Sequence, residues 1–303
     1  VRVPIGVLLV IYESRPEVTI DVAVLCIKSG NAVILKGGSD AKHTNEALYD
    51  CIKNALKKTK LPTEIVDMIS SRDETKKLLV RDNDIDLVIA RGSYGMVRSI
   101  LDNSKIPVLA HSAGGARIFV DKSADLQMAE KIILSSKISK PSACNSLDTI
   151  VIHKSIARKF LPKIIPLLLS KNIKVIGDDT VFNLIKVQIA KNKDWDTEFL
   201  GLTISIKIVK DIVEASEFIN ERSKKHSEGI VATDKKVIKY FKNTVDCAAL
   251  FINCSPRLHD GYIFGLGSEI GIATGKLHAR GPVGLKELTT YKWEIYGKGN
   301  IRK

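Results

Sequence analysis

Short apolar runs alternate with amphipathic runs along most of the chain, and this alternation limits the possible folds more than any other feature. In the first part of the chain, apolar runs typical of buried strands cover residues 7–12, 32–36, 65–69, 87–90 and 117–120. Runs with helical spacing cover residues 18–28, 40–56 and 73–81, with Gly30 closing the first and Ser39 capping the second. Such an alternation predicts an α/β fold in which helices cover both faces of a parallel sheet.

The second part of the chain repeats this pattern. Strands are expected over residues 149–153, 173–176, 203–209, 229–233 and 248–252, and helices over 125–137, 155–170, 211–222 and 234–243. The pattern is weakest over residues 177–202. We therefore expect two parallel-sheet α/β domains, over 1–114 and 115–265, followed by a Gly-rich segment with a terminal strand over 266–303. A cleft between the domains is the expected place for a site.

Composition limits the classes of protein to which the chain can belong. The 303 residues are 45% hydrophobic and 27% charged, which is typical of a globular protein with no membrane partner. The N-terminus begins with a strand-like segment rather than a signal peptide, so we expect a cytoplasmic protein. It also lacks an initiator Met, as a fragment would.

The net charge of +13 raises the alternative of a nucleic-acid binder. However, the lysines are spread along the chain in short pairs, such as Lys57-Lys58 and Lys76-Lys77, and aromatic residues make up only 6%. Such a distribution favours solvated helix faces over a basic binding stripe, so no nucleic-acid partner is expected.

The cysteine pattern argues against a metal site. The five cysteines are odd in number and form no C-x-x-C pair, as a zinc site or a redox motif would. Cys26, Cys51 and Cys247 lie among apolar residues and are predicted to be small buried side chains. Cys144 and Cys254 lie in polar, loop-like segments and remain candidates for chemistry.

Cys144 is the stronger of these two candidates. It lies between a predicted helix and a predicted strand, with Lys137 and Lys140 nearby in the sequence. Cations stabilise a thiolate, and a loop leaves it accessible, so this environment suits a nucleophile.

Two strand ends carry residues suited to a phosphate group. Lys36-Gly37-Gly38 follows the predicted strand over 32–36, and Arg91-Gly92-Ser93 follows the strand over 87–90 and opens a helix. Exposed backbone N–H groups, a lysine and a helix N-terminus all favour anions at the carboxyl edge of a parallel sheet. A tight turn with a surface lysine is the simpler alternative for the first of these ends.

Five sequence motifs resemble one known family. These motifs are Ile-Tyr-Glu-Ser-Arg-Pro over 11–16, the run over 30–38, Ala143-Cys144-Asn145, Phe-Gly-Leu-Gly over 264–267, and Leu-His-Ala-Arg-Gly-Pro-Val-Gly over 277–284. Together they resemble the gamma-glutamyl phosphate reductases of the aldehyde dehydrogenase superfamily, in one order from residue 1 to 302. The family's N-terminal helical region has no counterpart in this sequence.

The resemblance implies an oxidoreductase of proline biosynthesis. The expected activity is NADPH-dependent reduction of L-glutamyl 5-phosphate to L-glutamate 5-semialdehyde and phosphate, by a glutamate-5-semialdehyde dehydrogenase. The first domain would bind the cofactor and the second would carry Cys144 as the nucleophile. Asn145 would meet an oxyanion through its backbone N–H or its side-chain amide. The last segment would return to the cofactor domain or to an oligomer interface.

The resemblance also assigns binding residues. Lys36, Gly37 and Gly38, with Arg91, Gly92 and Ser93, would hold the adenosine and phosphate end of NADPH. Glu198 would hold the nicotinamide ribose hydroxyls, to which a carboxylate is suited, although a solvated acid at a strand start is the alternative. The residues expected to bind the substrate phosphate or carboxylate, or alternatively to form structural salt bridges, are Arg15, Arg257, His278 and Arg280.

One absence in the sequence fits a reductase. Hydrolytic aldehyde dehydrogenases need a general base, usually a Glu just before a Gly-Gly pair, whereas this chain has His-Ser-Ala-Gly-Gly over 111–115. A thioester that is reduced by hydride needs no attacking water, and therefore no general base to activate one.

The chain also departs from the family's usual pattern. It has Glu17 in place of Asn, Ala116-Arg117 in place of Cys-His, Asp148 in place of Glu, and Pro256 in place of Thr. These departures keep open a weakened or inactive relative that binds nucleotide or serves as a scaffold. The expected partners are a small-molecule substrate, a second copy of the chain and glutamate 5-kinase.

Overall fold

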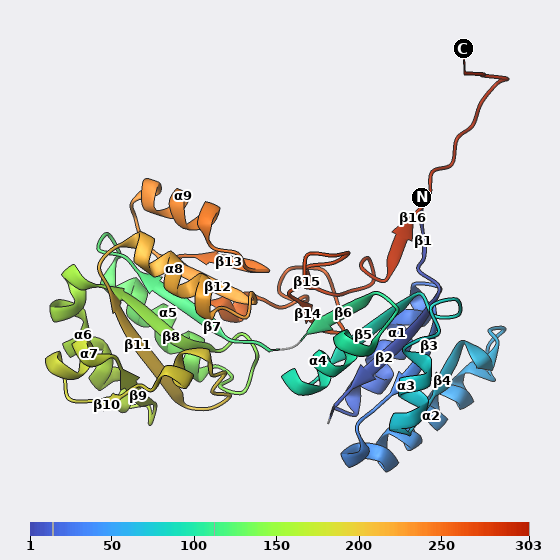
Figure 1. The fold of residues 1–303 in the computed structure, drawn as a ribbon, viewed down its shortest axis with the longest axis horizontal. Helices are drawn as coiled ribbons and strands as arrows, with labels where there is room; N and C mark the ends of the chain where they lie inside the picture. Colours follow the sequence, from blue (N-terminus) through green and yellow to red (C-terminus); the bar gives the residue numbers. More distant parts are fainter. Residues whose placement is uncertain (14, 112, 303) are drawn as a thin grey trace. The chain divides into compact units, whose positions relative to one another are not determined.

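The computed structural model describes residues 1–13, 15–111 and 113–302, and the chain divides into two compact units (Figure 1). The first unit comprises residues 1–112, 266–271 and 277–303, and the second comprises residues 113–265 and 272–276. Each unit is built around its own parallel sheet.

The sheet of the first unit has five parallel strands in the order β4-β3-β2-β5-β6. They are β2 (Val7–Tyr12), β3 (Ala32–Lys36), β4 (Val66–Met68), β5 (Leu87–Arg91) and β6 (Val108–His111). From the central β2 the chain first builds the sheet to one side, through β3 and β4, and then crosses over to β5. The carboxyl ends of β2 and β5 therefore flank a topological switch point, where open α/β sheets bind ligands.

Side chains cap two of the four described helices in the first unit. The prediction that Ser39 caps the helix over 40–56 was wrong, because this helix begins at Lys42 and Ser39 lies in a 3-10 turn before it. They are α1 (Glu17–Lys28), α2 (Lys42–Leu56), α3 (Arg72–Leu78) and α4 (Tyr94–Asn103), with short 3-10 turns η1 (Ser39–Ala41) and η2 (Thr63–Ile65). Ser71 and Glu74 form a capping box at α3, and the Ser93 hydroxyl caps α4. The last segment contributes β15 (Gly281–Pro282) and β16 (Thr289–Tyr291), and β16 pairs antiparallel with β1 (Arg2–Pro4).

The sheet of the second unit has seven parallel strands in the order β10-β9-β11-β8-β7-β12-β13. They are β7 (Ala116–Val120), β8 (Leu147–His153), β9 (Lys174–Gly177), β10 (Gln188–Ile189), β11 (Thr203–Val209), β12 (Ser227–Val231) and β13 (Ala249–Ile252). Every residue of the central β8 is buried, as expected for a strand covered on both faces.

Five helices enclose this second sheet. They are α5 (Leu126–Ile138), α6 (Lys154–Leu169), α7 (Asp179–Leu184), α8 (Ile212–Arg222) and α9 (Lys235–Thr244), with 3-10 turns η3 (Asn192–Asp196) and η4 (Pro256–Leu258) and a short β14 (Ile272–Ala273). One core joins α5 and α6 to the sheet through residues such as Ile133 and Phe160, and a second joins α8 and α9 through Ile219 and Phe241. Aspartate side chains cap four of these helices.

The predicted fold class, two parallel-sheet α/β domains, is confirmed. The differences lie where the pattern was weak or short. Strand β6 was not predicted, because it is only four residues long and follows Pro107. Helix α7 and strand β10 lie in the stretch over 177–202, where the sequence showed no clear period.

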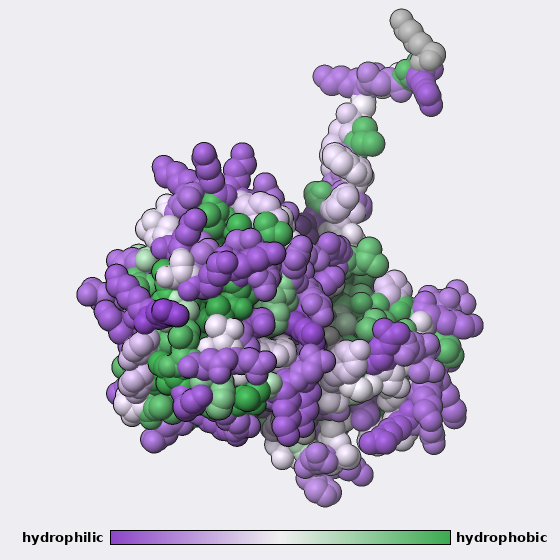
Figure 2. Space-filling model, turned by 60° about the vertical axis from the view of Figure 1, so that its left-hand side comes forward, coloured by the Kyte–Doolittle hydropathy of each residue, from purple (hydrophilic) through white to green (hydrophobic). Residues whose placement is uncertain are grey.

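Hydrophilic side chains cover most of the face shown in Figure 2, in agreement with the lysine-rich helix faces predicted above. None of the helices within the described ranges combines the length and the apolar character needed to cross a membrane. The segment after β16 carries large apolar side chains in contact with solvent, among them Trp293, Ile295 and Tyr296.

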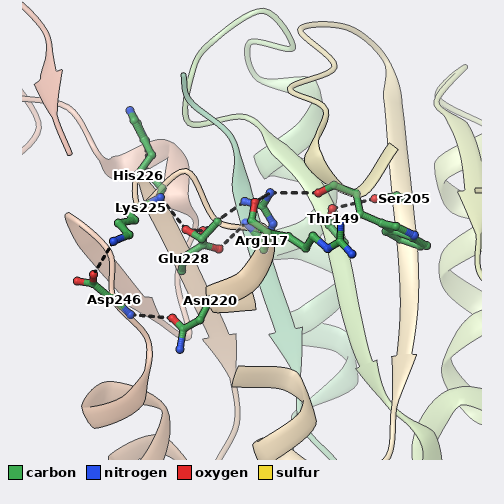
Figure 3. A network of polar contacts seen from close by, with 12 residues as sticks. Arg117, Thr149, Ser205, Asn220, Lys225, His226, Glu228 and Asp246 are labelled. Atoms are coloured by element: carbon green, nitrogen blue, oxygen red, sulfur yellow. Dashed lines mark hydrogen bonds and ion pairs between the residues drawn. The ribbon is translucent and has the colours of Figure 1, made fainter. Parts of the chain in front are cut away.

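A buried ion pair joins two neighbouring strands of the second sheet (Figure 3). Arg117 on β7 lies opposite Glu228 on β12, and their charged atoms are 3.4 Å apart. The Arg117 backbone N–H and the Ser223 hydroxyl also donate to the Glu228 carboxylate, at 3.1 and 2.6 Å. Burial raises the pKa of Glu228 to about 7, although the Arg117 guanidinium acts in the opposite direction.

The Glu228 pKa predicts a specific pH dependence of stability. Because the folded protein holds this proton more tightly than the unfolded chain, the stabilisation is present below pH 4.5, the usual pKa, and is lost as pH rises through about 7. Glu228→Gln should therefore gain stability relative to the unchanged protein over this range, by at most about 1.4 kcal/mol per pH unit. Urea unfolding at a series of pH values measures the difference. The exposed Glu217→Gln serves as the control, and an equal pH trend in both variants would contradict the assignment.

Candidate active site

Cys144 lies in a turn between α5 and β8 and is partly exposed. Gly114 packs directly against it: a Cβ atom at position 114 would lie 2.5 Å from the Cys144 Cβ and 2.6 Å from its Cα. The backbone N–H of Gly115 donates to the Cys144 carbonyl. Only a glycine can approach the cysteine backbone this closely, so the turn before β7 is shaped around the thiol-bearing turn.

Glu198 joins the same cluster. Its carboxylate accepts a hydrogen bond of 3.2 Å from the Gly114 backbone N–H. The sheet order explains why these distant residues meet. Gly114, Cys144 and Glu198 each precede one of three neighbouring parallel strands, β7, β8 and β11, so the three segments enter the sheet at the same edge. This edge is the amino edge of the second sheet.

The side chain of Asn145 is held within the protein. Its Nδ2 donates to the His259 carbonyl at 2.9 Å, and its Oδ1 accepts from the Arg257 guanidinium. Arg257 also donates from Nε to the Ser139 hydroxyl at 3.2 Å. The structure thus brings Arg257 next to the residue that follows Cys144. It gives the Asn145 amide a structural role, and the backbone N–H of Asn145 remains our candidate for an oxyanion.

Lys137 does not act as the surface cation that its position in the sequence suggested. Its side chain is fully buried, and its Nζ lies 3.4 Å from the Asp148 carboxylate. Burial lowers the pKa of Lys137, and the Asp148 carboxylate opposes this shift. The same carboxylate accepts a 3.2 Å hydrogen bond from the Phe199 backbone N–H. An ion pair therefore takes the place of the predicted thiolate-stabilising lysine.

In the first unit, the predicted phosphate-binding residues lie at the carboxyl ends of β3 and β5, the two strands that flank β2. Lys36 ends β3 and is half-buried; burial lowers its pKa, nearby Arg72 lowers it further, and Glu13 opposes both. Gly37 follows, and a Cβ atom there would lie 3.2 Å from the ring of Tyr12 and would displace the Asn45 amide. Gly38 precedes the η1 turn in an extended conformation.

Glu13 occupies the N-terminal end of α4. Its carboxylate accepts from the Ser93 backbone N–H at 2.6 Å and from the Ser93 hydroxyl at 3.2 Å. A Cβ atom at Gly92 would collide with the same carboxylate, and the Arg91 guanidinium donates to the Ile270 carbonyl. The turn predicted to receive a cofactor phosphate thus already binds an anion at the switch point between β2 and β5.

The remaining predicted anion ligands also lie in the first unit. Arg15 is exposed just before α1. His278 and Arg280 line a pocket of about 300 Å³ together with Arg2 and Lys286. His278 adopts a positive φ of 64°, and its Nε2 lies 2.5 Å from the Glu287 carbonyl. The specific motif over 277–284 therefore contributes to a cationic pocket.

The other cysteines differ in their surroundings. Cys26 is buried, and burial raises its pKa to about 12. The prediction that Cys51 is buried was wrong, because it lies on the exposed face of α2. Burial raises the pKa of Cys254. Cys247 is partly buried against the α8 and α9 core.

Glu13, Gly114 and Asp148 belong to the site, although no local pattern in the sequence predicted a role for them. Glu13 directly follows β2, and Lys36 and Arg91 are the last residues of β3 and β5. A charged residue at the end of a buried strand is a signal that could have marked Glu13. Gly114 and Asp148 carried no local signal, because their contacts depend on the order of strands in the sheet. Ser112 and the side chain of His111, which belong to the expected place of a hydrolytic base, lie outside the described residues.

Comparisons with known proteins agree with these features. A model of the aldehyde dehydrogenase family matches residues 1–181. The chain is 45% identical to the gamma-glutamyl phosphate reductase of Dictyoglomus thermophilum and 44% identical to that of Thermoanaerobacter pseudethanolicus. Both alignments cover 100% of this chain and 74% of the relative.

Solved structures show the same relationship. The crystal structure of gamma-glutamyl phosphate reductase from Thermotoga maritima superposes with a TM-score of 0.96 at 42% identity, covering 100% of this chain and 74% of that one. An acetylating aldehyde dehydrogenase from Geobacillus thermoglucosidasius shares the fold, with a TM-score of 0.73 at 17% identity, covering 100% of this chain and 77% of that one.

The contact between Gly114 and Cys144 can be tested directly. Gly114→Ala should lower the free energy of unfolding by about 1–3 kcal/mol, because the added methyl group must displace the Cys144 turn. Gly275→Ala is the matched control, since a Cβ atom there meets nothing within 4 Å, and its effect should stay within about 0.5 kcal/mol. Urea unfolding of the two variants measures both effects. Equal stability of the two variants would show that the turns do not pack as described.

Proposed function

Because the chain belongs to the aldehyde dehydrogenase family and, within it, to the gamma-glutamyl phosphate reductases, we propose that it reduces L-glutamyl 5-phosphate to L-glutamate 5-semialdehyde and releases phosphate. The observation that carries the proposal is the cluster in which the backbone of Gly114-Gly115 joins the Cys144 turn to Glu198. Membership of the family implies a nicotinamide cofactor, and we propose NADPH.

The residues of the first unit fit the adenosine and phosphate end of such a cofactor. Lys36 and the Arg91-Gly92-Ser93 turn lie at the carboxyl ends of β3 and β5, the two strands that flank β2. The Glu13 carboxylate would have to leave the Ser93 N–H before a cofactor phosphate could bind there. Glu198 would accept hydrogen bonds from the nicotinamide ribose hydroxyls. When bound, the cofactor would supply a hydride to the substrate carbon.

Cys144 would carry the covalent step. Its thiolate Sγ attacks the acyl phosphate carbon and forms a C–S bond; the C–O bond to phosphate breaks, and phosphate leaves with that electron pair. After reduction, the tetrahedral carbon expels Sγ, which regenerates the thiolate and leaves the aldehyde. The Asn145 backbone N–H is our candidate for stabilising the oxygen that becomes negative in both steps.

Cations would bind the two anionic ends of the substrate. Arg257, which reaches Asn145 beside the nucleophile, is our first candidate for the phosphate. His278 and Arg280 are candidates for the carboxylate through the cationic pocket they line, and Arg15 is a further one. We further propose that the enzyme acts in the cytoplasm as a homo-oligomer and receives its labile substrate from glutamate 5-kinase.

Reverse turnover tests the role of Cys144. Glutamate 5-semialdehyde, phosphate and NADP should yield NADPH, measured by its absorbance, and Cys144→Ser should reduce the rate to below about one-thousandth. Cys254→Ser is the control and should keep the rate. Full activity of the Cys144 variant would overturn the covalent mechanism, and NADPH binding without turnover in the unchanged protein would favour a nucleotide-binding relative.

The role of Lys36 can be separated from that of the catalytic cluster. Lys36→Met should raise KM for NADPH about tenfold while KM for NADH changes little, because the lysine would contact the additional phosphate of NADPH. Steady-state kinetics with both cofactors measure this difference, with the exposed Lys28→Met as the control. A parallel rise of both KM values would place Lys36 elsewhere on the cofactor.

A further inference from the structure

Glu198 lies in a segment that has little regular structure of its own. Between β10 and β11 the chain forms only the short η3 turn, and Leu200 adopts a positive φ of 49°. Such a segment needs tertiary contacts to hold one conformation. For a residue proposed to bind cofactor hydroxyls, the position of this backbone decides whether the carboxylate faces its ligand.

A single buried carboxylate, that of Asp148, contacts the segments on both sides of Glu198. Its Oδ1 accepts the Phe199 backbone N–H at 3.2 Å, directly after Glu198. Its Oδ2 faces Gly115, where a Cβ atom would lie 3.1 Å from this oxygen. Gly115 directly follows Gly114, whose backbone N–H donates to Glu198. Asp148 also lies four residues after Cys144 at the start of β8, so it links all three segments of the cluster.

Lys137 contacts the same oxygen of this carboxylate as the Phe199 N–H does. Its Nζ lies 3.4 Å from Asp148 Oδ1 and 5.8 Å from the centre of the Phe199 ring, in a cation–π geometry. Both charged side chains are at most 3% exposed. A buried ion pair rarely adds stability over apolar residues of the same volume, so a role in fixing one conformation is the better explanation for its presence.

We propose that Asp148, held by Lys137, is a positioning residue that fixes the Phe199 backbone and thereby aims Glu198. This inference rests on the cofactor role proposed for Glu198. The pair would act through the hydrogen bond that the Phe199 backbone N–H donates to Asp148. Arg117 supports the other end of the same segment by donating to the Trp195 carbonyl at 3.2 Å.

Two double variants isolate this hydrogen bond. Lys137→Met with Asp148→Asn removes both charges but keeps an oxygen that can accept the Phe199 N–H. Lys137→Met with Asp148→Leu removes both charges and the acceptor. The expected result is that the Leu variant raises KM for NADPH about tenfold with a smaller change in kcat, whereas the Asn variant stays close to the unchanged protein.

Thr149→Val is the matched control. It breaks a buried 2.8 Å contact between Thr149, which follows Asp148 on β8, and Ser205 on β11, and it leaves the Asp148 carboxylate in place. It should lower stability without moving KM for NADPH. A rise in KM as large as that of the Leu variant would reduce Asp148 to a general structural role, and an unchanged KM in the Leu variant would overturn the proposal.

Hydrogen exchange makes the test independent of activity. The Phe199 amide should exchange about tenfold faster in the Leu variant than in the Asn variant, since only the latter keeps the acceptor. If the unchanged protein neither binds NADPH nor turns over, the proposed function fails, and the exchange rates still decide whether Asp148 holds the segment. If the unchanged protein is active and the exchange rates of the two variants agree, the positioning role alone fails.

Discussion

Helices cover both faces of the two parallel sheets, and this constraint places every functional group described above. Strand interiors such as that of β2 are apolar because they meet no water. Most polar groups of the candidate site therefore lie at strand ends and in the turns that join the strands to helices. In the first unit they gather at the carboxyl ends of β2, β3 and β5, and in the second unit at the amino ends of β7, β8 and β11.

Two pairs of charged side chains are buried in the second unit. Arg117 with Glu228, and Lys137 with Asp148, are each almost completely removed from solvent. Since an isolated charge is costly to bury, each member requires the other. Both pairs also use backbone hydrogen bonds to hold residues 195–199, so the burial of charge and the geometry of the candidate site have the same physical origin.

The sequence predicted most of the secondary structure because long apolar runs and strong caps act locally. Strand β2 and the helix capped by Asp211 needed no tertiary information. Strand β6 did, since only pairing with β5 makes its four residues a strand. Cys144 could be singled out by residue type and by family motif. The approach of Gly114 and the contacts of Asp148 could not, because they depend on strand order, which a single sequence does not encode locally.

The cluster around Cys144 also has a consequence for biosynthesis. Gly114 and Glu198, whose hydrogen bond closes the cluster, are 84 residues apart, and Cys144 leaves the ribosome well before Glu198. Until β11 pairs with β8, the Cys144 thiol lacks the contacts that depend on residues far along the chain. The nascent protein therefore carries an ordinary cysteine. The contacts that surround Cys144 form only after the second unit has folded. Any reaction of the thiol with cellular electrophiles that depends on these contacts is delayed until then.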